Sequence, residues 1–433
     1  MAADGTTSYG DQGLNLLDLA RVRAGTHTGP IQTTEALDSQ LAYINETRRE
    51  HGYSKAIDRM FDLVLDYVHH AEDSWRNGGN VIWTAAPLMP VYYANGILPI
   101  PLSELGRLGS ADALAVAEDY FQLPKESCSM VGSILGEFYL RVGRTPRRMV
   151  VYNAACEPLN LGWELLKDEG FDVFRVESVN RPNVADDPER VAQLQNFFID
   201  EIKRVSLWLT GKPIDETRLQ AEIIRANRII GKMRRILRLR LHNPLYIRSL
   251  ATMYTLAGMS TYYGKPDEYE EVLDTLIEEL EVAARAPEPH NELVRLAWVG
   301  GRGQEFGVYK TIDDAGGAIT GWHSGADDWT RDYREDLPPL EAYADYIITA
   351  RTLGSPVRQR TRIEEYLPEF GAKGILFYGY IGCSFGSVHR EIQAEYFQRL
   401  GYPGIFLEGS FQVGPPTGQL LTRVRAFVEM LSR

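Results

Sequence analysis

The stretch RMVVYNAACEPLNLGWELLKDEGFDVFRVES, residues 148–178, decides the fold. It opens with a short apolar run, continues with helix-spaced apolar residues from Pro158 to Gly170, and closes with a second apolar run. A strand, a helix and a second strand in this order predict two parallel strands joined by a crossover helix. Because both strand runs are almost continuously apolar, we expect the sheet to be covered on both faces.

The same pattern returns near the C-terminus, where the run GILFYGYIGC (374–383) precedes a helical segment, the strand GIFLEGS and a terminal helix. Two further apolar runs, VIWTAA (81–86) and LVRLAWVGGRG (293–303), add one strand to each half. We therefore expect an α/β fold with two Rossmann-like parallel-sheet domains, an N-terminal helical segment and a helical insert. The expected boundaries are 1–78 for the N-terminal arm and helices, 79–184 for the first Rossmann-like domain, 185–290 for the helical insert and 291–433 for the second Rossmann-like domain.

Composition narrows the functional classes. The 433 residues are 44% hydrophobic and 24% charged, as in ordinary globular proteins, and no stretch reaches the roughly 20 apolar residues of a membrane span. The start, MAADGTTSYGDQGLN, lacks the basic and apolar parts of a signal peptide, so a cytoplasmic location is expected. The net charge of −13 disfavours nucleic acid as a partner.

A basic stretch, GKMRRILRLRLHNP (231–244), is either a solvated helix face or a docking face for an acidic partner.

The chain has three cysteines, Cys128, Cys156 and Cys383. Their odd number and the absence of a CxxC pair argue against a disulfide framework and a zinc ribbon. Cys156 and Cys383 fall at the carboxyl ends of predicted strands, where parallel sheets bind ligands, and Cys128 falls just before a predicted helix. The three are either buried core residues or thiolate ligands of a zinc ion or an iron–sulfur cluster.

Several segments resemble the 2-hydroxyacyl-CoA dehydratase and benzoyl-CoA reductase family of oxygen-sensitive, ATP-activated iron–sulfur enzymes. The matching segments are LPKESCSMVGSILGEFYL (123–140), VVYNAACEPLNLGWELLKDEGFDVFRVE (150–177), LVRLAWVGG (293–301), GILFYGYIGC (374–383), GYPGIFLEG (401–409) and GQLLTRVRAFVEML (418–431). In addition, YYANGILPIPL (92–102) resembles the family's Ala-Ala-Gly-x-x-Pro segment. The three-cysteine set and the Thr-Arg-x-x-Ala-Phe-x-Glu ending are the most specific parts, and the resemblance runs from about Val81 to the C-terminus.

The resemblance implies an iron–sulfur subunit whose single cluster is held by Cys128, Cys156 and Cys383. The cluster implied is 4Fe–4S, or an 8Fe–9S double cubane in one branch of the superfamily. In the dehydratase branch, the open iron site binds the thioester oxygen of an acyl-CoA substrate and delivers one electron, which leads to loss of the hydroxyl group. The implied partners are an ATP-dependent activator that donates the electron and a second homologous subunit, in a heterodimer or a homodimer.

One segment departs from the family. Dehydratases of this type often carry a Pro-Glu pair just before the Ala-Gly segment, but TAAPLMPVYYANG (84–96) contains no acidic residue. Tyr92 and Tyr93 stand there as candidate proton donors or as packing residues. Near the third cysteine, Ser384 is a candidate hydrogen-bond donor to the cluster or the thioester, or a helix cap, and His389 is a candidate acid or a surface residue. Besides a dehydratase, the sequence leaves open a benzoyl-CoA reductase-type subunit, a double-cubane reductase and a non-redox protein that binds a ligand in its cleft.

Overall fold

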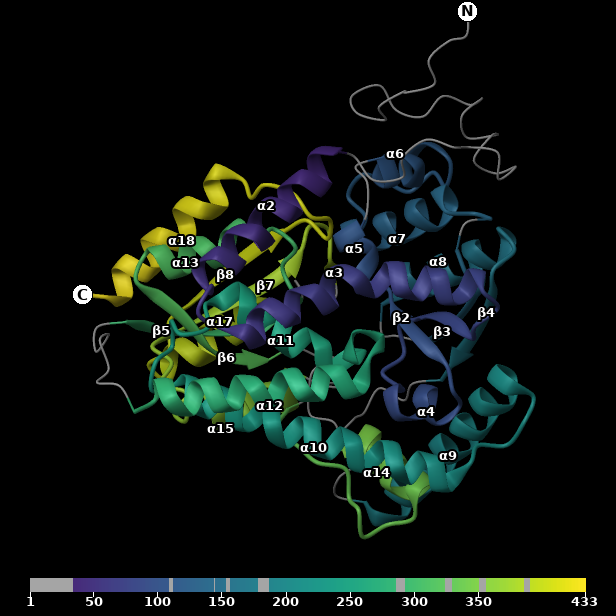
Figure 1. Ribbon diagram of the computed structural model, residues 1–433. Coiled ribbons are helices and arrows are strands. Elements are labelled where there is room, and N and C mark those ends of the chain that lie inside the picture. The colour runs from purple at the N-terminus through teal and green to yellow at the C-terminus, as the bar shows by residue number, and fades with distance from the viewer. Residues whose placement is uncertain are drawn as a thin grey trace, which may run out of the picture.

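The computed structural model describes residues 34–108, 112–143, 145–152, 156–177, 187–285, 293–323, 329–349, 356–384 and 390–433. These residues form two four-stranded parallel sheets set among many helices (Figure 1). The prediction of an α/β fold with two parallel-sheet domains is confirmed.

The first sheet has the strand order β2-β1-β3-β4. Its strands are β1 (Val81–Thr84), β2 (Leu98–Pro101), β3 (Arg148–Tyr152) and β4 (Asp172–Val176), with helices α4 (Met89–Ala94), α5 (Ser103–Leu108), α6 (Asp112–Asp119), α7 (Ser129–Leu140) and α8 (Glu157–Asp168) between them. The sequence analysis did not predict β2, a strand of four residues that include two prolines. The strand lies at the sheet edge, where an absent amide N–H breaks no ladder hydrogen bond.

The second sheet has the matching order β6-β5-β7-β8. Its strands are β5 (Val294–Gly300), β6 (Gly317–His323), β7 (Gly374–Tyr380) and β8 (Gly404–Gly409), and its helices are α13 (Gly307–Asp314), α14 (Pro339–Thr349), α15 (Pro356–Tyr366), α17 (Arg390–Arg399) and α18 (Gly418–Leu431). Each sheet has a switch point, at which successive strands change from being added on one side to being added on the other. It lies between β1 and β3 in the first sheet and between β5 and β7 in the second. Open parallel sheets bind ligands at such a switch point, beyond the carboxyl ends of the strands.

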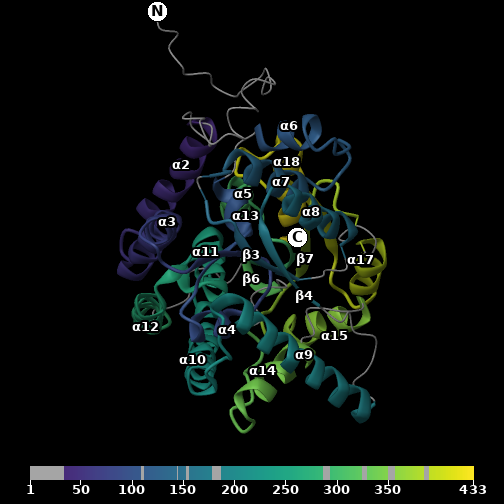
Figure 2. The same cartoon turned by 90° about the vertical axis from the view of Figure 1, so that its right-hand side faces the viewer.

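The remaining helices come from the N-terminal segment and from the chain between the sheets. They are α2 (Thr34–Glu50), α3 (Lys55–Arg76), α9 (Pro188–Thr210), α10 (Glu216–Arg240), α11 (Ser249–Ala257), η2 (Gly258–Ser260), η3 (Tyr262–Gly264) and α12 (Pro266–Ala283). Helices α10 and α12 run side by side below the sheets, and α14 packs against α9 and α10 (Figures 1 and 2). A helix from the second half of the chain thus covers the helices of the insert, and the domain boundaries stay predictions.

The basic stretch of α10 is paired within the chain. Lys232 contacts Glu270 and Asp274 of α12 at 3.0 and 2.7 Å. The arginines of the stretch pair as Arg234–Asp332, Arg235–Glu281 and Arg238–Glu369, while Arg240 is buried and donates to the carbonyls of Ile247 and Ile319. These contacts pair the basic side chains within the chain, while Arg235 and Arg238 remain 61% and 63% exposed.

Candidate functional site

The three cysteines come from three separate loops and pack into one hydrophobic cluster. Cys128 immediately precedes α7 and Cys156 immediately precedes α8, while Cys383 lies three residues beyond β7. Cys156 and Cys383 thus lie just past the strands that were expected to end on them. The structure brings together the three residues that the sequence singled out, at the carboxyl edges of both sheets.

The thiols interact with one another. A hydrogen bond with the Cys383 side chain, followed by burial, raises the pKa of Cys128, and the backbone amides of Met130 and Val131 act in the opposite direction. Burial is also the main cause that raises the pKa of Cys156. The amide of Leu159 acts to lower this pKa, and the nearby Cys383 acts to raise it. Cys383 therefore lies within electrostatic reach of both other thiols.

Cys128 and Cys156 both stand at helix N-termini, where the nearby backbone amides of Met130 and Val131 or of Leu159 act to lower the thiol pKa. This position works toward the thiolate, but the hydrogen bond with Cys383 at Cys128 and burial at both residues have the larger effect and raise both pKa values.

A close contact between the two halves of the chain fixes the turn that carries Cys383. Gly382 has φ +75°, and a Cβ atom there would lie 2.5 Å from the carbonyl oxygen of Ser127. The amide of Ser129 donates to the carbonyl of Ile381 at 2.9 Å. Only glycine allows this approach, so the loop before α7 and the turn after β7 meet through their backbones.

The three cysteines offer thiol sulfurs as donor atoms for a metal group. In the part of the chain that the structure describes, no three His, Cys, Asp or Glu side chains are arranged to hold a metal ion. This absence concerns sites for a single metal ion. The ligands of a cluster of several irons lie further apart than the ligands of one ion. The chemistry of the donor set does suit such a cluster, because the three converging groups are all thiols and thiolates are the usual ligands of iron–sulfur clusters.

Both tyrosines of the segment 84–96, which differs from the family pattern, make hydrogen bonds within the protein. Tyr92 is fully buried, and its hydroxyl lies 2.6 Å from Oγ1 of Thr84, while the hydroxyl of Tyr93 donates to the carbonyl of Thr261 at 2.7 Å. Burial raises the pKa of both phenols. A proton-donating role for either residue stays a prediction.

Of the two candidates near the third cysteine, Ser384 is exposed directly after Cys383. His389 lies outside the described residues. A role for either residue in hydrogen bonding or acid catalysis stays a prediction.

The sequence reading missed a buried carboxyl group beside this site, that of Glu305 in the loop after β5. Its side chain is 6% exposed, and Tyr378 of β7 donates a hydrogen bond to its Oε2 at 3.3 Å. Burial is the main cause that raises the pKa of Glu305 above the ordinary value of 4.5. The available signal was a carboxylate a few residues beyond a predicted strand, at the edge where ligands bind.

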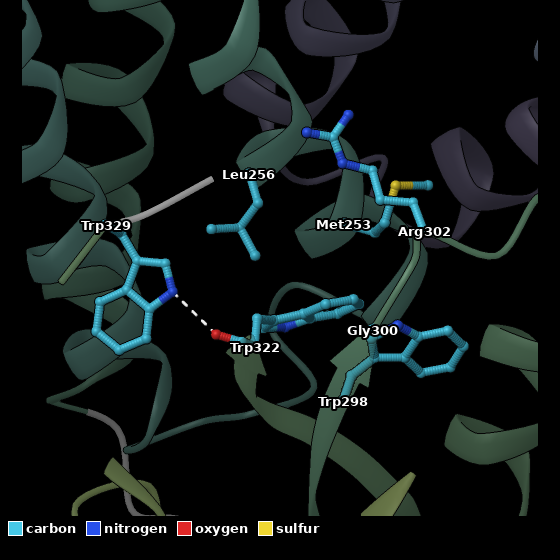
Figure 3. Close-up of a pocket in the computed structure, with 7 residues that line it drawn as sticks. All are labelled: Met253, Leu256, Trp298, Gly300, Arg302, Trp322 and Trp329. Carbon is cyan, nitrogen blue, oxygen red and sulfur yellow. Dashed lines mark hydrogen bonds between the residues drawn. The ribbon is translucent and has the colours of Figure 1, made fainter. Parts of the chain in front are cut away.

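A hollow bordered by three tryptophans lies at the ends of β5 and β6 (Figure 3). Its lining consists of Met253, Leu256, Trp298, Gly300, Arg302, Trp322 and Trp329. The enclosed volume is about 10 Å³, and the indole nitrogen of Trp329 donates to the carbonyl of Trp322 across one side (Figure 3). A water molecule needs roughly that volume, so the hollow is too small for an acyl group.

Comparison with protein families identifies the group to which these features belong. The family model of the 2-hydroxyglutaryl-CoA dehydratase D-component matches residues 89–431. The chain belongs to this family. The match includes all three cysteines, Glu305 and both tyrosines, and it confirms the resemblance drawn from the sequence segments. A search of curated proteins found no matching relative.

Membership in the D-component family makes the chain an enzyme subunit of the dehydratase type. No helix among the described residues is long and apolar enough to cross a membrane.

Proposed function

We propose that this D-component holds an iron–sulfur cluster through Cys128, Cys156 and Cys383 and takes part in the ATP-activated dehydration of a 2-hydroxyacyl-CoA thioester. The observation that carries the proposal is that three thiols from three loops pack at one hydrophobic cluster, with Cys128 buried and Cys156 and Cys383 partly buried. Membership in the D-component family supports the same reaction class.

The protein residues have two tasks in this proposal. The amides of Met130, Val131 and Leu159 stabilise thiolate charge on Cys128 and Cys156. The apolar side chains around them exclude water, which strengthens these interactions. When bound, an iron–sulfur cluster supplies a Lewis-acidic iron and a one-electron donor.

We propose a 4Fe–4S cluster in preference to an 8Fe–9S double cubane. Three thiolate ligands leave one iron of a single cube without a protein thiolate, as substrate binding requires. The proposed partners are an acyl-CoA substrate, an ATP-dependent activator that supplies the electron and a second homologous subunit. The proposed side of approach for the electron donor is that of Cys383, because Ile381 is 54% exposed there and Ser384 is also exposed.

Anaerobic purification tests the proposal. The expected result is a brown protein with about four irons and four sulfides per chain. Each of Cys128→Ser, Cys156→Ser and Cys383→Ser should lower the iron content, while Ser133→Ala, at a fully buried position of the helix that follows Cys128, should leave it unchanged. A protein that stays colourless after reconstitution with iron and sulfide would overturn the proposal, and twice the iron count would indicate the double cubane.

A reductase of acyl-CoA substrates is the second candidate. The observation in its favour is the absence of any acidic residue from the segment 84–96, where dehydratases of this type often carry a glutamate. Product analysis separates the two reactions, because dehydration releases water without changing the oxidation level and reduction adds two electrons to the product.

A further inference from the structure

Glu305 occupies a site that several elements build for a carboxyl group. Tyr378 of β7 donates to its Oε2, and the backbone at Ser410, just after β8, provides a second hydrogen bond. Gly409 leaves the space for this pair, because a Cβ atom there would lie 1.9 Å from the Tyr378 hydroxyl and 2.1 Å from Oε2 of Glu305. The loop after β5, strand β7 and the end of β8 therefore all contribute to the environment of one carboxyl group.

This carboxyl group lies at the switch point of the second sheet, next to the turn that carries the third cysteine. The loop containing Glu305 follows β5, and the turn containing Cys383 follows the neighbouring β7. The carbonyl of Gly409 accepts a hydrogen bond from the amide of Ile381 at 3.0 Å, two residues before Cys383.

Tyr380 connects the loop after β5 with the cysteines. Its hydroxyl donates to the carbonyl of Arg302 at 3.0 Å, in the loop that leads to Glu305. The thiols of Cys128 and Cys383 are close enough to raise the pKa of Tyr380, although burial is the larger cause. Glu305 and Cys383 thus lie in loops at the carboxyl ends of adjacent strands.

The environment of Glu305 suits proton transfer better than a structural ion pair. Its hydrogen-bond partners are a phenol hydroxyl and a backbone amide, and burial raises its pKa. A buried carboxyl group with a raised pKa and neutral hydrogen-bond partners is of the kind that serves as a general acid and base.

We propose that Glu305 is the carboxyl group that donates a proton to, and takes one from, a 2-hydroxyacyl thioester bound at the cysteine site. The inference rests on the proposed function. Within the described residues, Glu305 supplies from the second sheet the acid that the segment 84–96 of the first lacks.

In this role Glu305 loses one proton and regains one proton in each turnover. After a one-electron donor has reduced the substrate, the bond between C2 and the hydroxyl oxygen breaks, and the electron pair stays on oxygen. Glu305 gives its proton to that oxygen, which leaves as water, and becomes a carboxylate. The carboxylate then removes a proton from C3, which restores the acid, and the electron returns to its donor.

The variant Glu305→Gln tests this role, because glutamine keeps the size of the side chain and cannot exchange the proton. We expect turnover of a 2-hydroxyacyl-CoA to fall about 100-fold or more, while KM, iron content and visible spectrum stay close to those of the wild type. The matched control is Asp313→Asn, which neutralises another buried carboxyl in α13, the helix directly after the Glu305 loop. That control should keep turnover within a few-fold of the wild type.

A second measurement needs neither cluster nor turnover. Infrared difference spectra of wild-type chain minus Glu305→Gln should show a protonated carboxyl band that titrates above 4.5, the ordinary glutamate pKa. Tyr378→Phe should move this titration to higher pH, because it removes a hydrogen bond that lowers the pKa of Glu305. Addition of an acyl-CoA should shift the band, since the substrate lies next to the carboxyl.

The outcomes separate this inference from the proposed function. If wild-type protein binds iron and turns over and Glu305→Gln retains turnover within five-fold or so, the inference is wrong and the proposed function stands. If wild-type protein has no turnover, the infrared band decides: a Glu305 band that does not respond to acyl-CoA overturns the inference. Absence of iron with a responding band overturns only the proposed function.

Discussion

The backbone amide of Ser129 donates a 2.9 Å hydrogen bond to the carbonyl of Ile381, and this contact joins the two cysteine loops at their backbones. Ser129 follows Cys128 at the start of α7, and Ile381 lies two residues before Cys383 beyond β7. The relative position of these two thiols is therefore set by main-chain geometry. Side-chain packing alone would hold them less firmly, because thiol side chains rotate.

Replacing Gly382 by alanine tests this main-chain contact. The added Cβ would lie 2.5 Å from the carbonyl of Ser127, at a φ of +75°. We expect the variant Gly382→Ala to lose several kcal/mol of unfolding free energy and most of its iron, since the turn has to move away from α7. Denaturant unfolding and iron analysis after anaerobic reconstitution measure the two effects.

The matched control for this prediction is Gly316→Ala. Gly316 has a similar φ of +85°, but an added Cβ would meet no atom within 4 Å. The control should lose only the cost of a left-handed alanine, about 1–2 kcal/mol, and keep its iron. Equal losses in the two variants would show that backbone strain, and not the contact with Ser127, matters at Gly382.

The sequence predicted the parallel sheets and the cysteine set because both depend on local patterns. Strands β3 and β7 are almost continuously apolar, and Cys156 and Cys383 follow them at short distances. The family segments then connected Cys128 to the other two.

Glu305 escaped prediction because its chemistry is not local. In the sequence it follows a glycine turn and looks like a solvated loop residue, and the partner that buries it, Tyr378, is 73 residues away. Strand β2 was missed for a related reason: its prolines are acceptable only at the edge of a sheet, and its place in the strand order follows from the whole fold.

A second prediction concerns the phenol hydroxyls of Tyr92 and Tyr93, in the segment 84–96. The variants Tyr92→Phe and Tyr93→Phe each remove one hydroxyl that donates to a backbone carbonyl, that of Ala86 or of Thr261. We expect each to lower the free energy of unfolding by about 1 kcal/mol, with turnover close to that of the wild type. A proton-donating tyrosine would instead show a large fall in kcat with little change in stability, so both quantities should be measured in the same preparations.

The buried carboxyl of Asp313 makes stability depend on pH. Burial is the main cause that raises its pKa from 3.8 to about 6, against hydrogen bonds from Ser249 that lower it. Between about pH 4 and pH 6 the folded chain therefore holds a proton that the unfolded chain has released. Raising the pH through this window removes that proton and the stability that it gives.

The comparison to make is with Asp313→Asn, in which Ser249 can still donate its amide proton to the side-chain oxygen. From pH 5 to pH 8 the wild type should lose on the order of 1 kcal/mol of unfolding free energy relative to the variant. Urea unfolding of both proteins at the two pH values gives this difference. A constant difference would mean that Asp313 titrates with the same pKa in both states.

Two helix glycines give a last prediction about how α7 is positioned. Gly136 lies in α7 where that helix crosses α6, and an added Cβ would lie 1.8 Å from the carbonyl oxygen of Ala113. Gly136→Ala should therefore force the helices apart, lower the free energy of unfolding by several kcal/mol and displace Cys128 at the start of α7. Gly231→Ala, in α10, should have the opposite sign: an added Cβ meets nothing within 4 Å, so better helix propensity should raise stability by about 0.5–1 kcal/mol. Opposite shifts in the denaturant midpoint, with loss of iron only in Gly136→Ala, would show that the α6–α7 crossing sets the position of the first thiol.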